Sequence, residues 1–189
     1  MAIVKKIGGL SVVIPTYREV SLTNILTNGN FASTTGWTAT GASFSVASNE
    51  ATFLANSQND FLVRSDVSIT NAHKYYFCGS LKAASASVRM VMSDVAGYDV
   101  AANSAGSGAY EFLGNVFTAP SSKANAAMYV LNDLRASGWD TLNGKYYSIM
   151  DITASFGAGY EPTAAQMARL MEQFPNKYLD GTQVAKYDW

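Results

Sequence analysis

Aromatic rings stand beside acids in turn-rich segments of this chain. The segments "AGYDV" and "SGWDT" each pair a ring with a carboxylate among small residues typical of turns, and "AGYEP" offers a further ring in a similar setting. A flat ring can stack on the apolar C–H face of a sugar, while a nearby acid accepts hydrogen bonds from its hydroxyl groups. The pattern therefore predicts a glycan-binding surface; alternatively, each ring covers one end of the hydrophobic core. The candidate glycan-binding residues are Tyr98, Asp99, Tyr110, Trp139, Asp140 and Tyr160.

The residue types that most catalytic sites need are scarce. His73 is the only histidine, and its sequence context is that of a surface turn, so a histidine-activated nucleophile has little support. One histidine and one cysteine exclude a zinc site built from several such ligands. Glycoside hydrolysis would need two convergent carboxylates, but spacing singles out no pair. We therefore expect a protein that is not an enzyme, with a glycan hydrolase as the alternative. The acids available are Asp94, Asp99, Glu111, Asp133, Asp140 and Asp151.

The composition favours strands and turns over charged helices. Of the 189 residues, 48% are hydrophobic and 14% are charged, against about 25% charged in an average globular protein. A net charge of −1 gives no electrostatic sign of nucleic-acid binding. No run approaches the ~18 apolar residues of a membrane-spanning helix. Cys78 is the only cysteine, so an internal disulfide is excluded, and its strand-like context predicts a buried thiol.

Between Ser21 and about Thr153 the pattern predicts about eight to ten short strands, as in a β-sandwich. The segments "SFSVAS" and "EATFLA" flank Asn49 at a spacing typical of a hairpin. In "FLVRSDVSI" the alternation predicts an apolar face and an opposite face with Arg64 and Asp66. The residues expected on the apolar face are Phe61, Val63, Val67 and Ile69. A later alternating run comprises Val88, Met90 and Met92.

One short helix is predicted near the C-terminus, over about residues 163–174. Thr163 and Gln166 have the spacing of a capping box, and Pro175 ends the helix. The apolar face of the helix would dock on the sandwich or on a partner chain. The preceding "FGAGYEPT" predicts a sharp corner, since its two glycines permit unusual backbone angles. The apolar face comprises Met167, Leu170, Met171 and Phe174.

Residues 1–20 differ from the rest and are expected to form a unit apart from a sandwich domain over residues 21–189. The stretch "LSVVIPTYREV" is apolar and β-branched, and Pro15 disfavours a central strand. We expect an extended arm that packs on a neighbouring chain; a disordered leader or the first edge strand of the domain are the alternatives. The contacts of the arm would come from Val12, Val13, Ile14 and Tyr17.

Two stretches resemble known families. The stretch "NILTNGNF", followed by Trp37, resembles the opening of jelly rolls of the carbohydrate-binding-module type. The stretch "DITASFGAGYEPTAAQMARLMEQFPNKYLDGT", Asp151 to Thr182, resembles a C-terminal signature of tail and other virion proteins from phages and prophages of Gram-positive bacteria. The second match is the longer and more specific. With the strands between them, the two cover about residues 21–182.

The resemblance implies a jelly-roll β-sandwich that serves adhesion on the virion surface after synthesis in the host cytoplasm. Its partners would be other virion proteins, reached through the arm, further copies in a homotrimer, and a cell-wall or capsule polysaccharide of the host. Neither nucleic-acid binding nor membrane insertion is expected. The alternative is a purely structural fibre, decoration or baseplate protein of the head or tail, without a sugar site.

The resemblance also suggests a structural Ca²⁺ as the one possible cofactor. Many such jelly rolls hold this ion near the first strand with backbone oxygens and with acids or amides. Asn28, Gly29 and Asn30 occupy the matching turn, and their oxygen atoms are suitable hard ligands. The final-strand acid that often completes the site is missing, because Asp151 belongs to the virion-protein signature instead.

Overall fold

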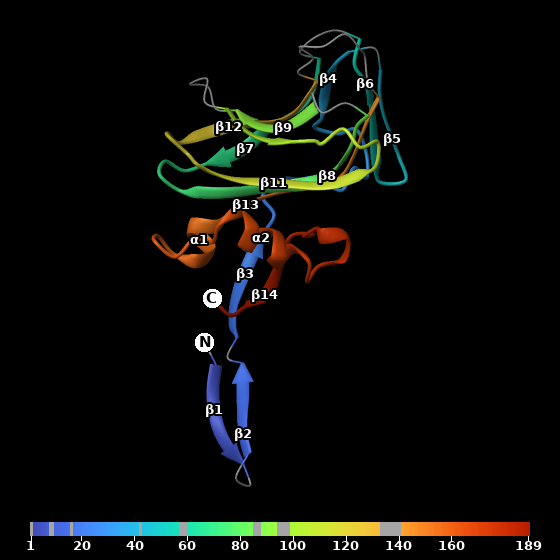
Figure 1. Cartoon of the computed structure of the whole chain (residues 1–189). Helices are drawn as coiled ribbons and strands as arrows, with labels where there is room; N and C mark the ends of the chain where they lie inside the picture. The colour runs from blue at the N-terminus through green and yellow to red at the C-terminus, as the bar shows by residue number, and fades with distance from the viewer. Residues whose placement is uncertain are drawn as a thin grey trace.

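The computed structural model describes residues 2–7, 10–15, 17–41, 43–56, 60–84, 88–93, 99–132 and 141–189. Figure 1 shows a sandwich of two β-sheets, a layer with helices against one of them, and two ribbons of paired strands that extend away from the sandwich. The described part of the chain is mostly β-sheet, which confirms the predicted all-β sandwich.

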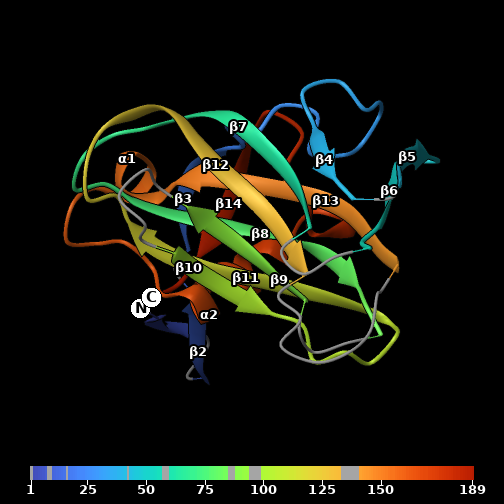
Figure 2. The same cartoon turned by 90° about the horizontal axis from the view of Figure 1, so that it is seen from above.

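Each sheet of the sandwich has five strands, and neighbouring strands are antiparallel. The first sheet, in the order β10-β9-β12-β7-β4, comprises β4 (Thr38–Thr40), β7 (Phe61–Ile69), β9 (Val88–Ser93), β10 (Asp99–Asn103) and β12 (Lys123–Asn132). The second sheet, in the order β11-β8-β13-β6-β5, comprises β5 (Ser43–Ala47), β6 (Glu50–Leu54), β8 (Lys74–Lys82), β11 (Tyr110–Thr118) and β13 (Thr141–Asp151). Seen from above, β7, β9 and β12 lie over β8, β11 and β13 (Figure 2).

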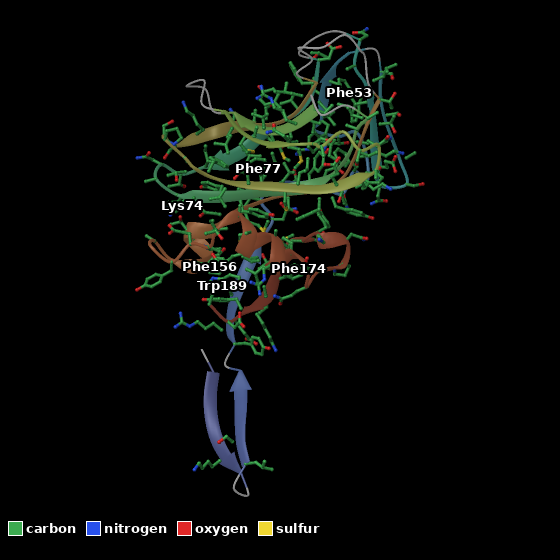
Figure 3. The ribbon with its side chains drawn as sticks, in the orientation of Figure 1. Phe53, Lys74, Phe77, Phe156, Phe174 and Trp189 are labelled. Carbon is green, nitrogen blue, oxygen red and sulfur yellow. The ribbon has the colours of Figure 1, made fainter. Side chains whose placement is uncertain are left out.

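The main core fills the space between the sheets, where Phe53 and Phe77 are both buried (Figure 3). Trp37 packs into the same core. Successive side chains of a strand point to opposite faces, and in β9 this places the predicted run of Val88, Met90 and Met92 in the core. The hairpin of β5 and β6 is also confirmed, because Asn49 lies in the turn between the two strands with a positive φ of 61°.

Strand β7 departs from the simple alternation expected of it. Arg64 is buried at 5% exposure, whereas Phe61 and Val63 are only half-buried, so the predicted apolar face was wrong for this half of the strand. The register with β12 shifts between Arg64 and Val67, where one residue of β12 opposes two of β7. Such a β-bulge moves every later side chain to the other face. The guanidinium donates to Thr35 O at 2.9 Å and thereby fixes the loop before β4.

A second hydrophobic cluster covers the outer face of the second sheet. The C-terminal residues that follow β13 form a layer there, together with strand β3 (Arg18–Thr23), which pairs with β14 (Thr182–Tyr187). We call this the C-terminal layer; Phe156 and Phe174 lie in it (Figure 3). Its helices are α1 (Ile152–Phe156), α2 (Ala164–Met171) and the 3-10 turn η1 (Pro175–Lys177). The cluster beneath includes Val20, Leu22, Tyr76, Cys78, Met150, Met167, Leu170 and Met171.

Helix α2 confirms the expected helix and its cap. Thr163 Oγ1 accepts the N–H of Gln166 at 3.3 Å, and Gln166 Oε1 accepts the N–H of Thr163 at 2.8 Å. The helix ends at Met171, earlier than expected. Helix α1 was not predicted, because the sequence pattern favoured a strand to about Thr153. Strand β13 instead ends at Asp151, whose side chain accepts the N–H of Ala154 and caps α1.

Two strands at the N-terminus form a separate hairpin, β1 (Ala2–Ile7) and β2 (Leu10–Pro15). Figure 1 shows this hairpin extending beyond the β3–β14 ribbon, on the side away from the sandwich. The expected boundary between residues 20 and 21 falls inside β3, which belongs to the C-terminal layer. The division into arm and domain stays a prediction, as does the role of the arm.

Asn24 joins three segments of the molecule directly after β3. Its Oδ1 accepts the N–H of Ile149 in β13 at 3.0 Å, and its Nδ2 donates to Leu179 O at 3.1 Å. Its backbone N–H donates to Gly181 O at 3.0 Å. The opening stretch of the sandwich is thereby tied to both the second sheet and the C-terminal layer.

Tyr147 lies fully buried against two glycines of the second sheet. Its ring contacts Phe31, with centroids 5.1 Å apart. A Cβ atom added at Gly79 would overlap the Tyr147 ring, and one at Gly144 would overlap its hydroxyl group. The two glycines therefore create the space that this ring occupies.

Gly79→Ala should lower the free energy of unfolding by about 1 to 3 kcal/mol, because the ring of Tyr147 must move within a close-packed core. Ser80→Ala, on the opposite face of β8, should change it by less than about 0.5 kcal/mol. Urea unfolding of both variants measures the difference. Equal effects of the two substitutions would contradict this account of the Tyr147 packing.

Candidate functional site

Part of the outer face of the second sheet is left open by the C-terminal layer. A row of side chains crosses all five strands on this part, because the register places Tyr110 opposite Lys82, Lys82 opposite Asn143, and so on across the sheet. Strands lie about 4.8 Å apart, so five strands make a surface about 19 Å wide. We call this surface the shelf. Its row comprises Tyr110, Lys82, Asn143, Thr52 and Ser45.

The orientation of the row follows from the strand period of two residues. The neighbours of the row along β5, β6, β8 and β13 pack in or against the main core, so the row itself points outward. These core neighbours include Ala51, Phe53, Leu81 and Leu142. Sequence reasoning found Tyr110 but missed the other members, because pairing between distant strands is not visible in a single strand's pattern.

Tyr110 is held on the shelf by two charged neighbours. Its ring is 39% exposed, and Lys145 Nζ lies 4.8 Å from the ring centroid. Lys145 Nζ also lies 2.7 Å from Glu50 Oε2. Burial, followed by the hydrogen bond to Glu50, raises the pKa of the Tyr110 phenol. The hydrogen bond from Lys145 outweighs burial and lowers the pKa of Glu50, so this carboxylate is ionised at neutral pH.

The shelf presents a partly exposed aromatic ring beside a row of polar side chains. Asn143 Nδ2 donates to Thr52 Oγ1 at 3.0 Å, which orients the amide. Next to the shelf, Lys177 of the C-terminal layer places Nζ 5.0 Å from the ring centroid of Phe112 in β11. The shelf is thus a polar surface with one aromatic platform, bounded on one side by the C-terminal layer.

A second group of aromatic side chains lies where the β3–β14 ribbon extends beyond the helices of the C-terminal layer. Tyr160 is 75% exposed there, and the rings of Tyr187 and Trp189 have centroids 5.2 Å apart. Two adjoining hollows of about 370 and 270 Å³ share these last two residues. We call the larger one the junction hollow. It is lined by Arg18, Gly159, Tyr160, Glu161, Gln166, Tyr187 and Trp189.

The "FGAGYEPT" stretch forms the expected corner, and Glu161 holds it in shape. The Glu161 side chain is 5% exposed; its carboxylate accepts the N–H of Gly159 and the hydroxyl of Thr153, both at 2.9 Å, and lies 3.3 Å from Lys74 Nζ. Burial opposes ionisation, but hydrogen bonds from backbone N–H groups, Thr153 and Lys74 outweigh it and hold the pKa of Glu161 below its usual range. Glu161 therefore stabilises the loop conformation, whereas the Tyr160 side chain is exposed to solvent.

The structure does not bring all predicted site residues together. Tyr110 belongs to the shelf, whereas Tyr160 lines the junction hollow. Tyr98, Trp139 and Asp140 lie outside the described residues, and of Asp99 only the backbone, in β10, is described.

The predicted contact residues of the arm are described only in part. The backbone of Val12, Val13 and Ile14 belongs to β2. Tyr17 is 58% exposed and lines the smaller hollow. The contact role of all four residues stays a prediction.

The turn suggested for Ca²⁺ has its oxygens directed at protein donors. Asn28 O accepts the indole N–H of Trp37 at 3.1 Å, and Gly29 O accepts the N–H of Tyr147 at 2.8 Å. Asn30 Oδ1 accepts a backbone N–H two residues further along at 3.2 Å. Within the described ranges, no three His, Cys, Asp or Glu side chains form a group suited to a metal ion. The Ca²⁺ site stays a prediction of the resemblance.

The acids considered for hydrolysis have structural contacts where they are described. Glu111 accepts the N–H of Ala105 at 2.7 Å and the hydroxyls of Ser104 and Ser107, so it shapes the loop before β11. Asp151 caps α1 and lies 2.8 Å from Nδ1 of His73. The side chains of the remaining candidates lie outside the described part of the chain.

No protein family and no curated protein sequence matches this chain. The fold is similar to the enzymatically active domain of tailspike protein 4 of bacteriophage CBA120, with a TM-score of 0.51 and 11% identity over 67% of this chain and 21% of that chain. It is similar to a CBM4 module, with a TM-score of 0.51 and 10% identity over 66% of this chain and 97% of the module. A carbohydrate-binding module of family 29 gives a TM-score of 0.46 and 12% identity over 70% of this chain.

The similarity to the CBM4 module shows that the sandwich shares the jelly-roll fold of carbohydrate-binding modules, as the resemblance implied. The matched portion spans about a fifth of the tailspike structure, at 21% of its length. No helix among the described residues is long and apolar enough to cross a membrane.

Glu161→Gln should lower the free energy of unfolding at pH 7, because the folded protein loses charge-assisted bonds to Thr153, Gly159 and Lys74. The folded pKa of Glu161 is depressed, so its stabilisation is complete above the unfolded value of about 4.3 and disappears as the pH falls through the folded value. Urea unfolding should therefore show a difference in unfolding free energy between wild type and variant that is smaller at pH 3 than at pH 7.

Glu19→Gln is the matched control. The Glu19 side chain is 64% exposed and its carboxylate lies 3.7 Å from Lys186 Nζ. An exposed pair of this kind contributes little, so the control should follow the wild type at both pH values. The electrostatic account would be refuted if the difference in unfolding free energy between the wild type and Glu161→Gln were the same at pH 3 as at pH 7.

Proposed function

We propose that this chain is a glycan-binding domain of a phage particle, not an enzyme, and that it holds the sugar on the shelf. The observation that carries the proposal is the row from Tyr110 to Ser45, which combines an aromatic ring with amide, hydroxyl and ammonium groups across five strands. The fold shared with carbohydrate-binding modules and with part of a phage tailspike supports it. The resemblance of Asp151 to Thr182 to a signature of phage virion proteins supports the phage origin.

In this proposal the shelf binds a saccharide through the Tyr110 ring and the polar side chains of the row. The Tyr110 ring stacks on the C–H face of one sugar unit, and the cation of Lys145 beside it fixes the ring's position. Asn143 offers an amide for sugar hydroxyls further along the row, with Thr52 holding its orientation. Because an amide both donates and accepts, it can bind neighbouring hydroxyls of one sugar together. The expected ligand is a cell-wall or capsule polysaccharide of a Gram-positive host.

Tyr110→Ala should weaken binding to purified Gram-positive cell-wall polysaccharide about tenfold, because loss of a stacking ring costs about 1 to 1.5 kcal/mol. Asn143→Ala should weaken it by a similar factor through lost hydrogen bonds. Tyr17→Ala, which removes an exposed ring away from the shelf, is the control and should bind like the wild type. Sedimentation with the polysaccharide measures all three, and wild-type affinity of both shelf variants would sink the shelf assignment.

A second candidate function is a structural part of the particle, favoured by the hairpin of β1 and β2 that extends beyond the sandwich (Figure 1). An isolated two-stranded hairpin is marginally stable in water, so partner chains would stabilise it. In this proposal the arm binds other virion proteins or further copies of the chain, with a trimer favoured, on the virion surface. The two functions are compatible within one protein.

Deleting residues 1–16 should abolish particle incorporation or dissociate the oligomer, while the melting temperature of the remaining domain changes by less than about 2 °C. The cut leaves β3 intact, so Val20 and its pairing with β14 are kept. Light scattering and incorporation into particles provide the two readouts. Retained mass together with normal incorporation would exclude the arm as the contact.

A further inference from the structure

The junction hollow combines exposed aromatic area with a concave shape. Tyr160 and Trp189 are 75% and 36% exposed, and Trp189 lies at the base of the C-terminal layer in Figure 3. The Tyr187 ring lies 5.2 Å from Trp189 and 5.3 Å from Phe156, centroid to centroid. Phe156 packs against the second hydrophobic cluster. Trp189 is therefore anchored to the folded layer through two successive ring contacts.

Arg18 reaches the same hollow because of its place in β3. Val20 and Leu22 belong to one face of this strand and are buried beneath the helices. Arg18 is the next residue of that face, lies directly opposite Tyr187 in the register, and is exposed beyond the cover of the layer. Arg18 thus lines a hollow that two exposed aromatic residues, Tyr160 and Trp189, also line.

The other polar residues of the hollow are engaged in the local structure. Glu161 accepts bonds from Gly159 and Thr153 and is paired with Lys74. Gln166 Oε1 accepts the backbone N–H of Thr163 in the capping box. The Glu161 carboxylate is therefore compensated by Lys74 inside the protein, and Arg18 contributes a cationic residue to the lining.

We propose that the junction hollow is a second binding site and that it takes an anionic saccharide. The rings of Tyr160 and Trp189 stack on a sugar unit, and Arg18 binds its carboxylate or phosphate through parallel N–H donors. The volume of about 370 Å³ lies within the range of small-ligand pockets and suits one or two sugar units. This site has no residue in common with the shelf, so binding at the two sites can be tested separately.

The test is calorimetric titration of the full chain with trigalacturonic acid and with the same trisaccharide after reduction of its carboxyl groups. The acidic form should bind at least about tenfold more tightly than the reduced form, as expected of a charge-assisted contact. Galactose 6-phosphate against galactose forms the phosphate arm and shows which anion is preferred. The indole N–H signal of Trp189, followed by NMR, should shift with the same affinity.

Three variants locate the site. Arg18→Gln should remove the preference for the acidic trisaccharide and leave weak binding of both forms, whereas Tyr160→Ala should weaken both about tenfold. Lys123→Gln, an equal loss of charge at the start of β12, is the control and should bind like the wild type. Because Arg18 and Tyr160 are exposed, thermal melting should be unchanged.

Binding of neither anionic sugar, equal binding of the acidic and reduced forms, or an unchanged preference in Arg18→Gln would each overturn the proposal. These outcomes are separate from those at the shelf, since Tyr110→Ala should leave binding of the acidic trisaccharide unaffected.

Discussion

The constraint on which the architecture depends is that the second sheet carries buried apolar side chains on both of its faces. In β8 the strand alternation directs Phe77 into the main core and Tyr76 and Cys78 to the opposite side. Burial raises the pKa of the Cys78 thiol, which keeps it protonated and inert. A sheet with such an outer face is stable only when another layer removes those side chains from water. The C-terminal layer meets this need.

Both candidate surfaces lie at the edges of the C-terminal layer, which covers only part of the second sheet. The uncovered part, with polar outward residues, is the shelf. At the other margin of the layer, the β3–β14 ribbon extends beyond the helices, and there Arg18 and Tyr187 line the junction hollow. The jelly-roll fold itself is shared at 10% identity with a carbohydrate-binding module. Because one fold serves many functions, the fold alone does not define what these two surfaces bind.

The sequence permits the prediction of features with a local physical cause. Alternation in β9, the hairpin at Asn49 and the capping box of Thr163 and Gln166 each depend on residues close in the chain, and all three were predicted correctly. The bulge of β7 was not, because it depends on the register with β12, about sixty residues further along. Helix α1 was missed for a related reason, since "DITASF" reads as a continuation of β13.

The candidate sites show the same limit. Tyr110 and Tyr160 could be selected as rings in turn-rich or strand-end contexts, but their separation onto two surfaces depends on the tertiary fold. Asn143 and Lys82 carry no signal of their own; only the pairing of β13 with β8 makes them neighbours. Arg18 appeared to be part of the arm, and its position opposite Tyr187 required the pairing of the two ends of the chain.

The pairing of β3 with β14 also determines how the molecule carries mechanical load. A pull on the hairpin of β1 and β2 enters the sandwich along β3, and Asn24 at the end of that strand anchors it to β13 and to the loop before β14. The ladder between β3 and β14 runs parallel to this force, so its hydrogen bonds are strained together and not opened one after another. A force between the two chain ends acts differently, because Arg18 and Tyr187 lie at the same end of the ladder and would separate first. The ribbon should therefore resist traction on the N-terminus far better than peeling from the C-terminus.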